Sequence, residues 1–203
     1  FGIFILASMI SAGALFVRIS VSLTHPVPAI GGAYTEGMLK QPRLINPMYA
    51  ANDADRDIAR LVFSGLLAYD GKGVLRTDLA DSYEIDQDAR IYTVTLRKNI
   101  LWHDGIPLDA EDILFTVKAI QNPQYKSPLR SNWQGVQVEK LDRHTIRFVL
   151  RAPYAPFIEN LTVGILPKHL WEHVPPEQTG LHELNIKPIG SGPYRFDAFK
   201  QNA

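Results

Sequence analysis

The chain has 203 residues, 46% of them hydrophobic, which is enough for one sizeable core or two small lobes. Its 21 Lys and Arg residues balance 21 Asp and Glu residues, so no basic excess favours nucleic acid as a partner and no acidic tail indicates disorder. Cysteine is absent, which excludes disulfides and thiolate metal sites.

The N-terminal segment is strongly apolar. Its first 17 residues, FGIFILASMISAGALFV, carry no charge, and the apolar run continues to Leu23 with only Arg18 as an interruption. This length approaches what a helix needs to span a bilayer. We predict that residues 1–23 form a transmembrane anchor or a secretion signal, with a buried soluble helix as the remaining alternative. Residues 24–31 are rich in Pro and Gly and are expected to form a linker.

A helix is expected to end near Phe63, with Asp53 or Asp55 as its N-cap and Gly65 as its C-terminal stop. Residues 66–69 are expected to form a strand that leads into a turn rich in Asp and Gly.

Residues 90–121 carry the clearest pattern in the chain, which predicts a strand, a tight turn and a capped helix. Apolar and polar side chains alternate over residues 92–97, as in a half-buried strand. The dipeptide Asp104-Gly105 indicates a turn, in which the carboxylate caps backbone donors and the glycine takes a positive φ. Asp109 is placed to cap the following helix.

Three further elements are expected in the second half. A hairpin is predicted over residues 136–150, a short helix over residues 153–161, and a polar loop over residues 122–134. The Gly190-Ser191-Gly192 segment lacks the Lys-Ser/Thr pair of a phosphate-binding loop, so it is interpreted as a structural turn.

Residues 92–117, YTVTLRKNILWHDGIPLDAEDILFTV, resemble the signature segment of the family-5 extracellular solute-binding proteins, the dipeptide, oligopeptide and nickel receptors of ABC importers. The positions that fit are Tyr92, Thr93, Leu96, Arg97, Trp102, His103, Asp104, Gly105, Pro107, Ala110 and Asp112. Shorter segments at residues 44–47, 79–83, 165–170 and 188–196 also resemble the family, so the resemblance covers residues 34–199.

This resemblance implies an α/β fold of the two-lobe periplasmic-binding-protein type (type II, peptide-binding class). Residues 32–52 and 164–203 would form the first lobe, with a strand at 188–196 and another at 33–38, and residues 53–163 would form an inserted small lobe. Family members are longer, so the chain is interpreted as an N-terminal fragment from which the second large lobe is missing.

The function implied by the resemblance is capture of a solute, with a di- or oligopeptide favoured, and its delivery to the membrane subunits of an ABC permease. The protein would be a monomer without enzymatic activity or cofactor. It would act at the periplasmic or extracellular face of the cytoplasmic membrane, either anchored or secreted. A receptor that feeds a signalling protein is an alternative.

The same resemblance implies substrate-binding residues at two places. Thr35, Glu36 and Gly37 would pair with an extended ligand by backbone hydrogen bonds, although an ordinary core strand would show the same sequence. Ser131 and Trp133 lie in the polar loop, where an amphipathic ring suits either ligand contact or a capping role in the small lobe.

A different class of function is suggested by His169-Leu170-Trp171-Glu172-His173, which matches the inverted zinc-peptidase motif. Two histidines four residues apart on a helix can share a metal ion. Pro175 and Pro176 end that helix early, and His182 is the nearest candidate for a third ligand. A membrane-anchored zinc peptidase using His169 and His173 is therefore kept as the alternative to a solute receptor, and a surface helix end is the simpler interpretation.

Overall fold

In the computed structural model, the described residues are 2, 13, 35–38, 41–50 and 52–198. The chain divides into two compact units, Phe1–Gly37 and Met38–Ala203. In the first unit, Gly2 and Gly13 are helical and residues 35–37 are exposed without regular structure. Apart from those two glycines, the predicted anchor or signal over residues 1–23 lies outside the described residues, as does the linker. Of the helices that are described, none combines the length and apolar character needed to cross a membrane.

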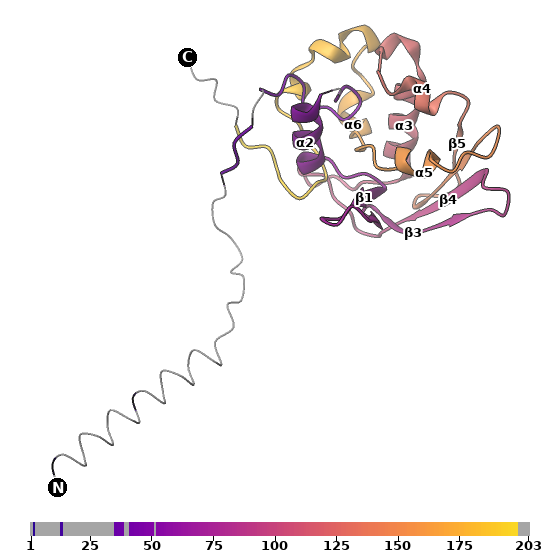
Figure 1. The fold of residues 1–203 in the computed structure, drawn as a ribbon. Helices are drawn as coiled ribbons and strands as arrows, with labels where there is room; N and C mark the ends of the chain where they lie inside the picture. The colour runs from indigo at the N-terminus through magenta and orange to yellow at the C-terminus, as the bar shows by residue number, and fades with distance from the viewer. Residues whose placement is uncertain (1, 3–12, 14–34, 39–40, 51, 199–203) are drawn as a thin grey trace. The chain divides into compact units, whose positions relative to one another are not determined.

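The second unit contains a four-stranded antiparallel sheet, a two-stranded sheet and a layer of helices (Figure 1). The strand order in the larger sheet is β3 (Ala80–Ile85), β4 (Ile91–Leu96), β6 (Thr145–Val149) and β5 (Gln137–Lys140), and the smaller sheet pairs β1 (Leu67–Tyr69) with β2 (Leu75–Thr77). The α-helices are α2 (Asp53–Val62), α3 (Ala110–Gln121), α4 (Arg130–Trp133), α5 (Phe157–Asn160) and α6 (Lys168–Trp171). Three 3-10 helices, η1 (Pro123–Tyr125), η2 (Pro176–Leu181) and η3 (Glu183–Asn185), complete the regular structure described.

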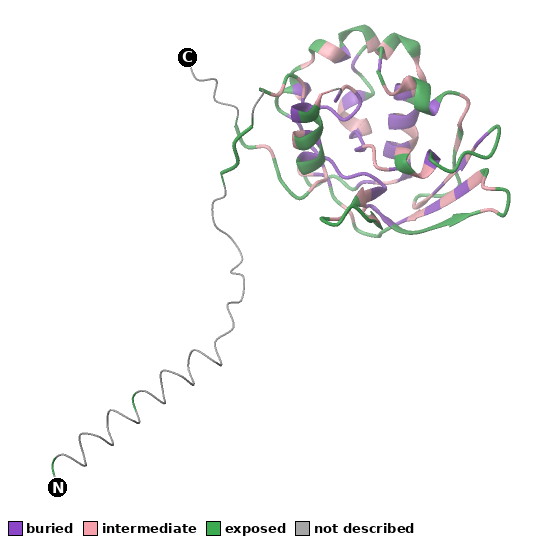
Figure 2. Cartoon of the chain, in the orientation of Figure 1, coloured by how far each residue is buried: buried purple, intermediate pink, exposed green. Residues whose placement is uncertain are grey.

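The core lies between the larger sheet and α3. Along β4, Tyr92, Val94 and Leu96 are buried and alternate with partly exposed residues, which confirms the predicted half-buried strand. The predicted hairpin is also confirmed, because β5 and β6 pair with Gln137 opposite Val149. Figure 2 shows buried residues along α3, and buried residues that alternate with partly exposed ones along β4.

Helix α3 begins with the cap that the sequence predicts. The Asp109 carboxylate accepts a hydrogen bond from the Glu111 N–H at 2.8 Å, and Asp112 reciprocates by accepting from the Asp109 N–H at 3.0 Å. The other carboxylate oxygen of Asp112 accepts from the Lys168 N–H at 2.8 Å, so Asp112 also ties α6 to α3. Burial raises the pKa of Asp112 above its ordinary range, and these backbone hydrogen bonds oppose that shift.

The predicted caps of α2 are wrong. Asn52, not Asp53 or Asp55, is the N-cap, and its side chain accepts from the Asp55 N–H at 2.9 Å. Asp55 lies inside the first turn, where its buried carboxylate accepts from the Arg43 N–H. Asp55 is the third residue of α2, so its backbone is already helical and it does not occupy the N-cap position.

The predicted role of Gly65 is also wrong. Helix α2 ends at Val62 and the chain becomes extended at Phe63, without a left-handed residue at Gly65. The glycine is instead required by close packing, since a Cβ at this position would lie 2.8 Å from the Thr162 carbonyl oxygen.

Two segments that were predicted to be strands, and one that was predicted to be a loop, have a different structure. Residues 35–38 form no strand, and residues 188–196 run alongside α2 without forming one. The backbone donors of this second segment bind the end of α2 instead, as when Gly192 N–H donates to the Val62 carbonyl at 2.8 Å. Strand geometry needs a neighbouring strand for its hydrogen bonds, and here a helix end provides the acceptors. The loop predicted over residues 122–134 contains η1 and α4.

The division into lobes at residues 52/53 and 163/164 stays a prediction. Side chains from both predicted lobes contribute to one hydrophobic cluster, in which Ile45 and Leu166 join Val94 and Ile113. Residues 38–203 accordingly form a single compact unit.

The turn at Asp104-Gly105 provides a test of local backbone strain. Gly105 has φ of 88°, and the Asp104 carboxylate accepts from the Ile106 N–H at 3.1 Å, as predicted. Gly105→Ala is expected to lower the free energy of unfolding by about 1–2 kcal/mol, because alanine is strained at this φ even though the space is open. Gly71→Ala, at an open turn position without a positive φ, is the matched control. Urea denaturation of both variants measures the difference, and equal values would contradict this account.

Candidate functional site

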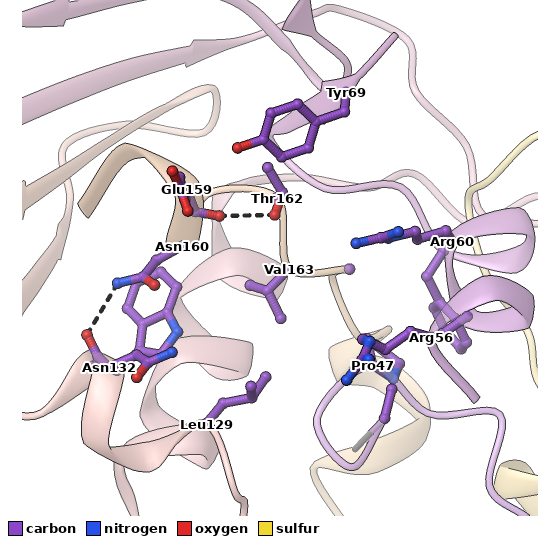
Figure 3. A pocket seen from close by; sticks show the side chains of 15 residues that line it. Pro47, Arg56, Arg60, Tyr69, Leu129, Asn132, Glu159, Asn160, Thr162 and Val163 are labelled. Atoms are coloured by element: carbon purple, nitrogen blue, oxygen red, sulfur yellow. Dashed lines mark hydrogen bonds between the residues drawn. The ribbon is translucent and has the colours of Figure 1, made fainter. Parts of the chain in front are cut away.

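The candidate site is an open cavity of about 320 Å³ between α2, β1, α4 and α5 (Figure 3). Its lining residues are Pro47, Ala50, Arg56, Ala59, Arg60, Phe63, Tyr69, Leu129, Asn132, Trp133, Glu159, Asn160, Thr162, Val163 and Gly164. A concave, partly apolar surface with a few polar groups is the usual form of a small-molecule site.

One wall of the cavity is formed by α2, which presents two arginines. Ala59 and Val62 of this helix are buried in the core, so the residues of its opposite side, including Arg56 and Arg60, are exposed. The two arginines are one helical turn apart and therefore lie on the same side. Arg56 forms an ion pair with Asp53. Arg60, in the last turn, is favourably placed with respect to the helix dipole.

The opposite wall joins α4 to α5 by side-chain hydrogen bonds. The Asn160 side chain donates to the Asn132 carbonyl oxygen at 3.0 Å, and the Thr162 hydroxyl donates to the Glu159 carbonyl oxygen at 2.7 Å (Figure 3). The first of these bonds joins the two short helices, and the second is local to the end of α5. Glu159, an exposed residue of α5, is also among the lining residues.

The floor of the cavity is apolar. Trp133 is only 2% exposed, and its ring packs against Phe157 and Phe148 with centroid distances of 5.6 and 5.9 Å. Leu129 and Val163 add aliphatic surface beside it. The cavity thus combines apolar surface with charged side chains of both signs among its lining residues.

The predicted binding residues lie in different parts of the structure. Trp133 lines the cavity, but it lies in α4 instead of a loop, and its ring belongs to the core. Ser131 is exposed, its hydroxyl lies 3.3 Å from the Asn132 side-chain oxygen, and it is not among the lining residues. Thr35, Glu36 and Gly37 belong to the other unit. A substrate-binding role for all five residues stays a prediction.

Sequence reasoning did not find Arg60, Tyr69 or Glu159. The spacing of Arg56 and Arg60 could have indicated two cations on one side of a helix. No sequence signal indicates that residue 69 and residues 159–164 cover that side, because these segments are brought together only by packing of the core.

The histidines of the peptidase-like motif have separate partners. The His169 ring nitrogen Nε2 lies 2.9 Å from an Asp104 carboxylate oxygen, which joins α6 to the turn before α3. His173 is 85% exposed in its side chain and lies 3.6 Å from Glu172. Within the described ranges, no group of three or more His, Cys, Asp or Glu side chains is placed to hold a metal ion. His103, which lies outside this motif, has another partner: its Nε2 lies 2.9 Å from the Gly192 carbonyl oxygen.

The comparison with protein families identifies the chain. Residues 74–203 match the model described as bacterial extracellular solute-binding proteins, family 5 middle. The chain belongs to this family. Among curated relatives, it is 33% identical to the oligopeptide-binding protein AppA of Bacillus subtilis over 178 residues, which cover 86% of the chain and 33% of AppA. It is 30% identical to the glutathione-binding protein GsiB of Pectobacterium atrosepticum over 181 residues, with 86% and 32% covered.

Solved structures of family-5 proteins have the same fold. NikZ from Campylobacter jejuni, in complex with nickel and L-histidine, superposes with a TM-score of 0.73 at 37% identity, over 80% of the chain and 32% of NikZ. AppA from B. subtilis, in complex with a nonapeptide, gives a TM-score of 0.76 at 33% identity, over 81% of the chain and 33% of AppA. The chain therefore spans about a third of the length of these relatives. The predicted family and α/β binding-protein fold are confirmed. These relatives are solute-binding proteins, and family membership places the chain in the bacterial cell envelope or outside the cell.

Proposed function

We infer that this chain forms part of the extracytoplasmic substrate-binding protein of an ABC importer for a peptide-type solute. The observation that carries the inference is the open cavity, with its apolar floor and charged walls, in a member of the family-5 solute-binding proteins. Relatives described as binding an oligopeptide and glutathione support a peptide-type ligand. The partner would be the permease in the membrane, and the protein would act as a monomer.

The cavity is open, so this surface makes only part of the contacts with a solute. Receptors with two lobes enclose their ligand when the lobes close around it. The rest of the protein would therefore provide the opposite side of the site. A separate expectation is that Thr35, Glu36 and Gly37 bind an extended ligand by backbone hydrogen bonds. Tight binding would then be a property of the native gene product, and residues 1–203 alone would bind weakly.

A zinc peptidase that uses His169 and His173 is the rival function. His169 is hydrogen-bonded to Asp104 and His173 lies near Glu172, and these separate partners favour a structural role for His169 and disfavour a shared metal. No cofactor enters the proposed function.

The test is a binding screen of the native gene product with a dipeptide and tripeptide library, followed by calorimetry and metal analysis. The proposed function requires at least one peptide to bind stoichiometrically without being hydrolysed. Release of cleaved peptide together with one bound zinc per chain would contradict the receptor function and favour the zinc peptidase.

A further inference from the structure

His103 makes three hydrogen bonds to the segment that lies against the end of α2. Its N–H donates to the Gly190 carbonyl at 2.8 Å, its ring nitrogen Nδ1 accepts from the Gly190 N–H at 3.3 Å, and its Nε2 lies 2.9 Å from the Gly192 carbonyl oxygen. The same segment binds α2, because the Gly192 N–H donates to the Val62 carbonyl at 2.8 Å. Residues 190–192 are therefore attached both to the turn that contains His103 and to the last turn of α2.

These bonds determine which nitrogen of the His103 ring carries the proton. The Gly190 N–H is a donor, so Nδ1 can bind it only as an acceptor that carries no proton. The Gly192 carbonyl oxygen is an acceptor, so Nε2 can bind it only as the donor. The hydrogen bonds therefore require a neutral ring that is protonated at Nε2.

A second proton on this ring would turn one of the bonds into a repulsive contact. A charged imidazole carries an N–H at both nitrogens, so its Nδ1–H would meet the Gly190 N–H. The segment cannot retreat toward α2, because Gly190 is buried and packs so closely that a Cβ there would overlap the Val62 carbonyl oxygen. The repulsion is relieved only when the ring and the segment separate.

We propose that His103 is a positioning residue whose protonation releases residues 190–192 and with them the support of the last turn of α2. A histidine side chain in water takes up its second proton near about pH 6.5. The contact is therefore complete above this range and is lost as the pH falls through it. Arg60 and Phe63, which line the candidate cavity, lie in and next to this last turn, so one wall of the cavity depends on pH. The proposal goes beyond the proposed function and stands whichever solute the cavity binds.

Other groups near this contact have a different effect. Those that are charged or titrate near neutral pH on the surrounding elements are Asp104, Asp112, His169, Arg60, Lys187 and Arg195. The Nε2 of His169 lies 2.9 Å from the Asp104 carboxylate, so its protonation would strengthen that pair and hold the turn more firmly in acid. Burial raises the pKa of Asp112, but its carboxylate binds α3 and α6. Release of residues 190–192 in acid thus distinguishes His103 from these groups.

Hydrogen exchange of the native gene product at about pH 8 and about pH 5.5 tests the proposal. Protection factors, which remove the intrinsic pH dependence of exchange, are compared for the amides of Gly192 and Tyr194. They are expected to fall about 10-fold at the lower pH, which corresponds to the loss of roughly one hydrogen bond. His103→Gln keeps a donor but does not titrate, so its protection factors should be equal at the two pH values. His173→Gln, which replaces a histidine whose side chain is 85% exposed, is the matched control and should behave like the wild-type protein.

Magnetic resonance of the histidine rings gives a second test that does not depend on the stability of a variant. Isotopic labelling of the histidine nitrogens shows which of them carries a proton, and the signals of His103 are those absent from His103→Gln. At about pH 8 the proton is expected on Nε2. A proton on Nδ1, or a charged ring at that pH, would overturn the proposal. Protection factors that stay constant between the two pH values, or that change equally in His103→Gln, would overturn it as well.

Discussion

Trp133→Ala is expected to lower the free energy of unfolding by about 3–5 kcal/mol, because it removes one of the largest side chains in the core. The indole is 2% exposed and packs on Phe148 and Phe157, so its removal leaves a cavity that the surrounding sheet and helices cannot fill. Urea denaturation of the 203-residue chain, followed by far-ultraviolet circular dichroism, measures this loss.

The same variant separates a core role of Trp133 from the predicted ligand contact. Trp133→Phe retains most of the ring packing and should recover more than half of the lost stability. Tyr154→Ala removes an aromatic ring that is 54% exposed and should cost less than about 1 kcal/mol. If Trp133→Ala were to unfold like the wild-type protein while the native gene product lost its peptide affinity, the ring would act on the ligand and the packing account would be wrong.

Gly190→Ala is expected to cost about 2–4 kcal/mol and to detach residues 188–196 from α2. A Cβ at this position would lie 1.9 Å from the Val62 carbonyl oxygen, a backbone atom that cannot rotate away. The displacement would also break the hydrogen bond from the His103 N–H to the Gly190 carbonyl oxygen, now 2.8 Å long.

Hydrogen exchange of the Gly192 and Tyr194 amides reports this detachment directly, because both donate to carbonyls of the last turn of α2. Faster exchange of these two amides is expected in Gly190→Ala. Gly180→Ala, where a Cβ would meet no atom within 4 Å, should leave both amides protected and stability nearly unchanged. Equal protection of the two amides in both variants would contradict this account. It would show that the chain accommodates a Cβ at residue 190 without detaching residues 188–196 from α2.

Local sequence patterns determined the elements whose formation depends on nearby residues. The alternation over residues 92–97 requires only the two-residue period of a strand. The cap at Asp109 requires only a backbone donor two or three residues away. Both features are present in the structure. The positive φ of Gly105 follows from the same kind of short-range constraint. The family was recognisable for the same reason, since its signature is one continuous segment.

Only the tertiary structure decided the features that join distant segments. Asp53 or Asp55 was expected to cap α2, but Asn52 is the N-cap, and the buried carboxylate of Asp55 accepts from the N–H of Arg43 in a preceding loop. Gly65 and Gly190 are needed because another segment passes close to them, at Thr162 and Val62 respectively, and no local pattern reports such an approach.

The candidate site is also a feature that only the tertiary structure decided. Arg60, Tyr69 and Glu159 come from α2, β1 and α5, and they line one cavity because the core packs these elements together. The sequence determined that a helix with two arginines would form. The fold of the second unit decided what lies opposite them, since packing of buried side chains joins residues that are far apart in the chain.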